Sequence, residues 1–189
     1  MSDNWSIGGW TTKIAGYLRD RLRSDYVRRT DAMAAVEFAL VAAPFFALII
    51  AILDLALLFV AQAALETAVE ETARLVLTGQ ALSAGLTQSQ FQQDVCNKLP
   101  SPFVCSGVMV DLQTASTFGG AVTTPPTLTY SGGNVTNAWQ YQIGGPGSIE
   151  VMRVMYQWPV VPGPLNLNFA NLANGSYLLM ATSVFRNEP

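Results

Sequence analysis

The sequence predicts an α+β fold in which a single long N-terminal transmembrane helix projects into a small antiparallel-sheet domain. Residues 32–60 form a nearly unbroken apolar run, helical periodicity continues to Gly79, and the rest alternates between short strands and turns. A chain of 189 residues has room for one span and one small domain. We therefore expect a basic leader at residues 1–32, a long helix at 33–79 with its span at about 33–60, and a β-rich domain at 80–189 that contains a disulfide.

The leader is set apart by its charge. Residues 1–31 carry six of the ten basic residues of the chain, whereas residues 32–189 carry four, against nine acids. The positive-inside rule then places the N-terminus in the cytoplasm and the C-terminal two-thirds outside. The exported part has no basic stripe, so we expect no nucleic-acid partner.

Within the leader, apolar residues recur every four positions between Lys13 and Tyr26. This pattern is compatible with a basic amphipathic helix on the anionic cytoplasmic leaflet and equally with a solvated leader. The apolar run after the leader is too long for a secretory h-region and has no A-x-A cleavage site behind it. We expect export without removal of the span.

The long helix is predicted to start at Thr30 or Asp31 as N-cap and to end at Gly79 in the left-handed conformation. About 47 residues at 1.5 Å each give roughly 70 Å, more than twice the bilayer core. The outer half should therefore project beyond the lipid. It carries an apolar stripe through Leu65, Val69, Thr72 and Val76. Pro44 removes one backbone hydrogen bond within the span and should bend the helix there. A buried helix of a soluble core is the alternative, but the remaining chain is too small to cover it.

In the domain, a short helix is expected around Gln88–Leu99, capped by Thr87 or Ser89. Cys96 and Cys105 lie on the exported side, where a disulfide is favoured over two free thiols. Strands are expected at residues 108–113, 128–130, 139–143, 149–158 and 177–185. Their order suggests an antiparallel sheet packed against the outer half of the long helix.

The sequence offers little for catalysis. It contains no histidine, and it has no phosphate-binding loop, nucleophile elbow or metal-ligand spacing. Glu70 and Glu71 are adjacent and diverge by about 100° on a helix, so they do not converge on one substrate. We expect a non-enzymatic protein with no cofactor and no metal.

Two acids interrupt the apolar run. Glu37 lies near the cytoplasmic end, where a carboxylate either costs free energy in lipid or reaches the headgroup water. Asp54 follows after 16 uncharged residues, about 24 Å along a helix, which suggests a position near the opposite interface. For Asp54 an interfacial position is favoured; for Glu37 the neighbouring sequence decides.

That neighbouring sequence is RRTDA-MAAVEFALVAAP, a basic leader followed by a small residue and by Glu37-Phe38 five places into an apolar helix. It resembles the processing site of type IV pilin-like subunits. The chain is similar to the TadE-like family, small pseudopilins or minor pilins of the tight-adherence (Tad) pilus system of bacteria. The similarity covers residues 28–80, and the terminal FRNEP also resembles the end of some members.

The resemblance implies that a prepilin peptidase cuts between Ala32 and Met33, where such sites usually have Gly in place of Ala32. Glu37 would then be the fifth residue of the mature chain and would serve assembly together with Phe38. It also implies that the partners are other pilin or pseudopilin subunits, the inner-membrane assembly machinery and the lipid bilayer, and that the function is pilus assembly for adhesion.

The alternative is an uncleaved single-pass protein whose periplasmic domain is a binding or sensor module. An exported enzyme is a more distant alternative. Processing separates the first two, because a mature protein that starts at Met33 favours the pilus hypothesis and an intact leader favours the anchored module.

Overall fold

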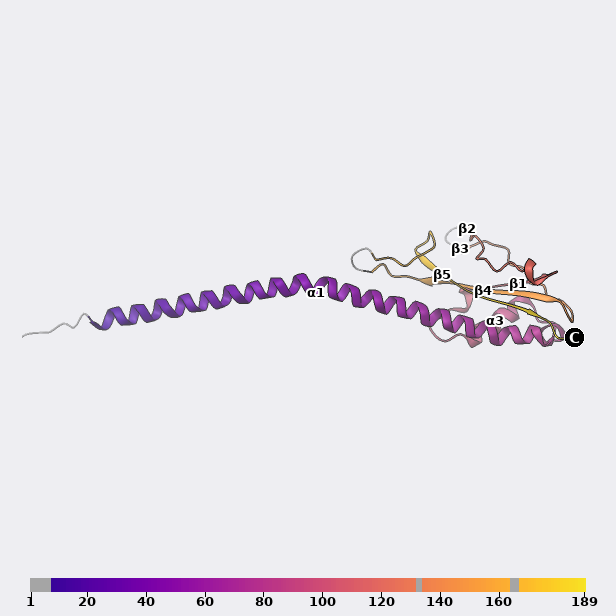
Figure 1. Ribbon diagram of the computed structural model, residues 1–189, viewed down its shortest axis with the longest axis horizontal. Coiled ribbons are helices and arrows are strands. Elements are labelled where there is room, and N and C mark those ends of the chain that lie inside the picture. Colours follow the sequence, from indigo (N-terminus) through magenta and orange to yellow (C-terminus); the bar gives the residue numbers. More distant parts are fainter. Residues whose placement is uncertain (1–7, 132–133, 164–166) are drawn as a thin grey trace, which may run out of the picture. The chain divides into compact units, whose positions relative to one another are not determined.

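The computed structural model of the chain describes residues 8–131, 134–163 and 167–189, with side chains described from Met33 onward except at Asn134. It has the predicted α+β arrangement of a long N-terminal apolar helix and a small antiparallel sheet (Figure 1). The helices are α1 (Gly8–Leu77), α2 (Gln80–Ser83) and α3 (Gln88–Lys98). The strands are β1 (Val108–Ala115), β2 (Tyr130–Ser131), β3 (Asn134–Val135), β4 (Ile149–Pro159) and β5 (Ser176–Arg186).

Helix α1 begins much earlier than predicted. It runs without a break from Gly8, so the prediction that Thr30 or Asp31 caps its start is wrong. No glycine or proline lies between Tyr17 and Pro44, and capping residues such as Thr and Asp are tolerated inside a helix when nothing else ends it. The helix expected around residues 13–26 of the leader is part of α1. Its side chains are not among those that the structure describes, so its predicted amphipathic faces stay a prediction.

The C-terminal end of α1 agrees with the prediction. The helix ends at Leu77, and Gly79 has a φ of 71°, the left-handed conformation that glycine adopts without a steric penalty. The short helix α2 follows at once and was not predicted. Pro44 lies inside α1, and the bend expected there stays a prediction.

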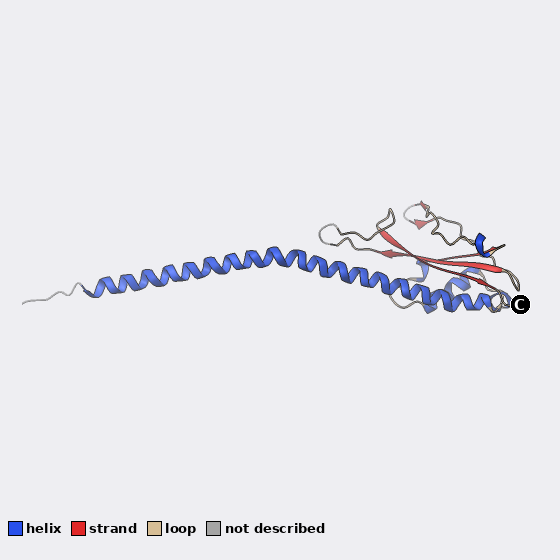
Figure 2. Cartoon of the chain, in the orientation of Figure 1, coloured by secondary structure: helices blue, strands red, loops and turns tan. Residues whose placement is uncertain are grey.

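The main sheet has three antiparallel strands in the order β1–β4–β5. Figure 2 shows the strands in red and the helices in blue. One face of the sheet packs on the C-terminal part of α1, as the sequence predicted. The stripe of Leu65, Val69, Thr72 and Val76 is buried, with exposed fractions between 0% and 2%, while Glu66 is exposed. The strands contribute Val110, Leu112, Met152, Val154, Leu179 and Ala181 to the same core. Burial of this apolar surface is the main stabilising contribution to the domain.

Helix α3 forms where its capping signal predicts. The Thr87 hydroxyl oxygen caps it by accepting from the backbone N–H of Gln90, and the side-chain oxygen of Gln90 accepts from the backbone N–H of Thr87, which completes a capping box. Phe91 and Val95 are buried in the core on the face that the spacing predicted. The side chain of Gln92 donates to the backbone oxygen of Val108 at 2.6 Å and so fixes α3 to the start of β1.

Of the minor strands, one prediction is wrong and one is shifted. Residues 139–143 form no strand; they make only an isolated parallel bridge between Leu112 and Tyr141. The bridge stays short because the backbone N–H of Gln140 donates to the side chain of Asp111 instead of to a strand ladder. The strand expected at 128–130 begins only at Tyr130, where it pairs with β3.

The predicted disulfide between Cys96 and Cys105 is present, with a Cα–Cα distance of 5.4 Å. It joins α3 to the short 3₁₀ turn that precedes β1. Nearby, the backbone N–H of Val104 donates to the Tyr156 hydroxyl at 3.2 Å, so the closed loop is also fixed to β4.

Replacing both cysteines by serine should lower the free energy of unfolding by about 2–3 kcal/mol, the chain-entropy value for a loop of about ten residues. We expect no effect on membrane insertion, because the apolar segment makes no use of the bridge. Urea unfolding of the detergent-solubilised full chain measures the loss, with the exposed neighbour Ser106→Ala as control. Unchanged stability, or rapid alkylation of both wild-type thiols without a reductant, would contradict this prediction.

Candidate functional site

The side chains of α1 between Met33 and Val60 form an extended apolar surface that is largely exposed. Phe38 and Leu40 are each 71% exposed, and Phe59 is 66% exposed. Residues 33–77 are long and apolar enough to cross a membrane, and only 11% of their most apolar 18-residue window is buried. A soluble monomer rarely exposes a contiguous apolar surface of this extent. The segment therefore fits contact with lipid or with other helices.

Glu37 is exposed at the N-terminal end of this surface, one helical turn after Met33, which is also exposed. Phe38 follows it directly. The two ion pairs in the described part of the chain, Lys98–Glu71 and Arg153–Asp111, do not involve Glu37. A carboxylate on an otherwise apolar helical surface favours pairing with a cation when helices pack together.

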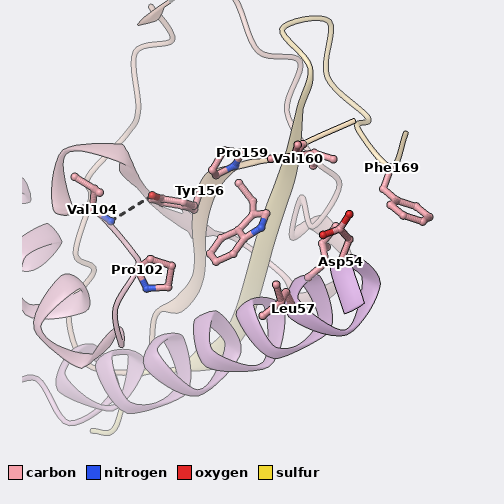
Figure 3. A pocket seen from close by; sticks show the side chains of 11 residues that line it. Asp54, Leu57, Pro102, Val104, Tyr156, Pro159, Val160 and Phe169 are labelled. Carbon is pink, nitrogen blue, oxygen red and sulfur yellow. Dashed lines mark hydrogen bonds between the residues drawn. The ribbon is translucent and has the colours of Figure 1, made fainter. Parts of the chain in front are cut away.

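Ala32 and Asp54, the other two predicted site residues on α1, have surroundings that differ from those of Glu37. Ala32 lies within the continuous helix, and its side chain is outside the described ones. Asp54 is half-buried and lines an apolar cleft together with Trp158 and Val160 (Figure 3). Sixteen residues separate Glu37 from Asp54 along the chain, and all of them belong to α1.

Buried charges in the sheet were missed by the sequence analysis. By its alternation with Val110 and Leu112, Asp111 has the sequence pattern of an exposed strand residue. It is nevertheless only 2% exposed and accepts a 3.0 Å hydrogen bond from Nε of Arg153. A second bond to the same carboxylate comes from the Arg153 Nη2 atom. The backbone N–H of Gln140 also donates to Asp111, at 2.8 Å. The pair fixes the long β1–β4 connection over the sheet. The sequence feature that could have indicated this pair is the opposite charge of Asp111 and Arg153, which face each other in the β1–β4 register. That feature can be recognised only when the pairing of the strands is known.

Glu150 is a second buried acid. Its Oε1 atom accepts from the Gly144 backbone at 2.8 Å and from the Ser148 hydroxyl at 2.9 Å. Burial raises the pKa of the Glu150 carboxyl above its usual value, and the hydrogen bonds from Ser148, Gly144 and Thr114 partly oppose that rise. The Asn187 side chain donates to the Gly144 carbonyl at 2.9 Å, which holds the C-terminal residues on the same loop.

The contacts of these two buried acids hold the fold together. The Asp111 carboxylate is occupied by Arg153, and Glu150 contacts backbone and hydroxyl groups that support a turn. Across the described ranges, no group of three His, Cys, Asp or Glu side chains is placed to hold a metal ion. The chemistry that these residues supply is structural.

One comparison with known proteins matches the helical segment. The sequence model of a family described as TadE-like protein matches residues 32–74. No curated protein and no solved structure matches the chain. The matched residues contain the exposed apolar surface, Glu37 and most of the stripe that packs on the sheet. The predicted resemblance to the TadE-like family is thus confirmed over residues 32–74 of the chain.

Proposed function

We propose that the chain is a non-enzymatic pseudopilin or minor-pilin-like subunit needed to assemble a Tad (type IV-like) pilus used in adhesion. One span holds it in the bacterial inner membrane, with the N-terminus in the cytoplasm and residues 80–189 in the periplasm. Its partners are other pilin or pseudopilin subunits, the inner-membrane assembly machinery and a prepilin peptidase. The TadE-like match over residues 32–74 supports an association with the Tad system in general, and the specific role is our proposal.

The observation that carries the proposal is the exposed apolar surface of α1 with Glu37 near its start. An anchor alone needs about 20 apolar residues and gains nothing from a carboxylate in lipid. A helix that packs against identical helices can use that carboxylate, because the free N-terminal ammonium group of each processed subunit must be neutralised when it leaves water. The placement of Glu37 one turn after Met33 suits this role.

Removal of the leader completes the arrangement. Cleavage after Ala32 would leave Met33 with a free ammonium at the helix N-terminus, where the helix dipole already adds positive charge. The basic residues before Thr30 keep the leader in the cytoplasm, where prepilin peptidases act. Glu37 would then neutralise the ammonium of its own chain or that of a neighbour displaced along the assembly axis.

Substitutions at Ala32 test the processing step. Ala32→Leu should leave the leader attached, because a bulky side chain replaces the small residue that the peptidase accepts. Ala32→Gly should be cut at least as well as the wild type. Electrophoretic mobility in a strain with and without its prepilin peptidase measures both, and Ala35→Leu in the adjacent apolar segment is the matched control. If Ala32→Leu is processed like the wild type, the assigned cleavage site is wrong.

A further inference from the structure

A cleft of about 310 Å³ lies at one end of the sheet, between α1 and the connection from β4 to β5 (Figure 3). Leu57 and Leu58 form its helical wall, and Trp158 and Phe169 lie across from them. Among the described residues that line it, Asp54 is the single charged one. We call the segment Trp158–Val161 together with Phe169 the β4–β5 rim.

The helix is also exposed and apolar at the level of this cleft. Leu57 is 59% exposed although it lines the cleft, and Phe59 and Val60 are similarly exposed at 66% and 67%, while Leu58, next to Leu57, is buried. The other exposed apolar side chains near this level are Leu53, Leu55, Phe59 and Val60. The apolar surface of the helix therefore continues past the position where the domain begins.

The rim itself has the composition of a membrane interface. From Val154 to Phe185 the sequence has no charged residue. Val161 is 76% exposed, so an apolar side chain projects from the rim. Trp158 packs against Phe103 with their ring centroids 5.4 Å apart. Tryptophan and tyrosine favour the headgroup level of a bilayer, because one end of the ring is apolar and the other is polar.

Helix length places this level in the bilayer. The residues from Met33 to Leu53 span about 31 Å of helix, which matches a hydrocarbon core of about 30 Å. Asp54 then falls at the outer boundary of the core. The apolar residues up to Val60 extend about 10 Å further, into the headgroup layer. The cleft opens at that same level, because Asp54, Leu57 and Leu58 line it.

We propose that the β4–β5 rim is seated in the outer-leaflet interface and that a phospholipid fills the cleft with the upper part of its acyl chains. Asp54 would remain at the boundary, where water and headgroups solvate its carboxylate. The inference rests on the proposed single span. It adds a second lipid contact, made by the folded domain, which fixes the domain against the membrane before the subunit joins any assembly.

A phospholipid fits the cleft better than a second copy of the chain. The walls of the cleft are almost uncharged and lie where the span enters the headgroup layer. Lipid is already present at that level, so it is the molecule that fills the cleft. A helix from a neighbouring subunit would have to displace that lipid, and its presence would depend on protein density. Such a protein occupant is one outcome of the test.

Depth-dependent quenching by brominated phosphatidylcholine tests this seating in vesicles that contain the full chain. The reporter protein keeps Trp158 alone, through Trp5→Phe, Trp10→Phe and Trp139→Phe. The far-end control replaces all four tryptophans and carries Leu82→Trp, an exposed position at the other end of the domain. We expect bromine at shallow acyl positions to quench Trp158 about twofold or more above this control.

A third reporter separates this inference from the proposed anchor. Phe46→Trp in the tryptophan-free background should be quenched by deep bromines if the segment spans the bilayer. If the Phe46→Trp reporter is quenched while Trp158 is quenched no more than the Leu82→Trp control, the proposed seating of the rim is wrong and the proposed membrane span is supported. If neither is quenched, the span and the seating both fail.

A matched pair of charged variants completes the design. Val161→Asp should lower Trp158 quenching about twofold, because a carboxylate opposes insertion of the rim. Val122→Asp, at a 55% exposed position outside the rim, should leave it unchanged. A protein occupant would instead give quenching that falls as the protein-to-lipid ratio rises, and that result would overturn the lipid assignment.

Discussion

Replacing Glu37 by alanine is expected to abolish co-purification with the pilus partners while leaving membrane insertion intact. Insertion should persist because the substitution makes the span more apolar. Assembly should fail because the Met33 ammonium of the processed chain would be taken from water without a partner. An unmatched charge of this kind costs on the order of 3–5 kcal/mol, which corresponds to an affinity loss of about a hundredfold or more.

Three variants act as controls for Glu37→Ala. Glu37→Gln keeps the size of the side chain and removes its charge, so it should fail in the same way. Asp54→Asn should have a much weaker effect, and Glu70→Ala, an exposed position on the same helix, should have none. Affinity purification from native membranes gives the bound fraction, and alkali extraction confirms insertion. If Glu37→Ala assembles as well as the wild type, Glu37 is only an interfacial residue.

The second large effect is expected in the folded domain, at the buried ion pair of Asp111 and Arg153. Asp111→Ala should lower the free energy of unfolding by about 3–5 kcal/mol, because it leaves the Arg153 guanidinium buried without its partner. The backbone N–H of Gln140 loses its acceptor as well. Chemical denaturation of the detergent-solubilised full chain measures the change.

The chain offers a matched control in its other described ion pair. Lys98 and Glu71 are 2.9 Å apart, but their side chains are 32% and 55% exposed. Glu71→Ala should therefore cost no more than about 1 kcal/mol. The double variant Asp111→Leu with Arg153→Met should regain much of the stability, since it removes the unpaired charge. If Asp111→Ala and Glu71→Ala lower the free energy of unfolding equally, burial does not determine how much an ion pair of this domain contributes to stability.

The elements predicted correctly have local signals. The stripe through Leu65 and Val76 repeats at helical spacing, and Gly79 ends α1 because its backbone adopts a positive φ. Helix α3 depends on Thr87 and Gln90, which are three residues apart. In each case the residues that decide the structure are close in sequence, so they can be recognised without knowledge of the fold.

The errors come from contacts between distant residues. Asp111 has the strand pattern of an exposed residue, and only its pairing with Arg153, 42 positions away, shows why it is buried. The segment around Gln140 has the composition of a strand but uses its backbone to bind that carboxylate. Thr30 and Asp31 resemble a cap, yet the helix continues because no residue there stops it.

In the candidate site, too, one part could be predicted from the local sequence and the other could not. Glu37 stands out in the sequence because it is a lone acid near the start of an apolar run. The cleft beside Asp54 does not, since its walls come from parts of the chain about one hundred residues apart on α1 and β4. Only the register of the sheet on the helix brings Trp158 to the level of Leu57.

The central claim, that this is a processed pilin-like subunit, is tested most directly by the intact mass of the wild-type protein purified from its native membrane. We predict a single species that lacks residues 1–32 and begins at Met33. A species that retains the leader with Trp5 and Trp10 would contradict the claim and favour an uncleaved, membrane-anchored binding module.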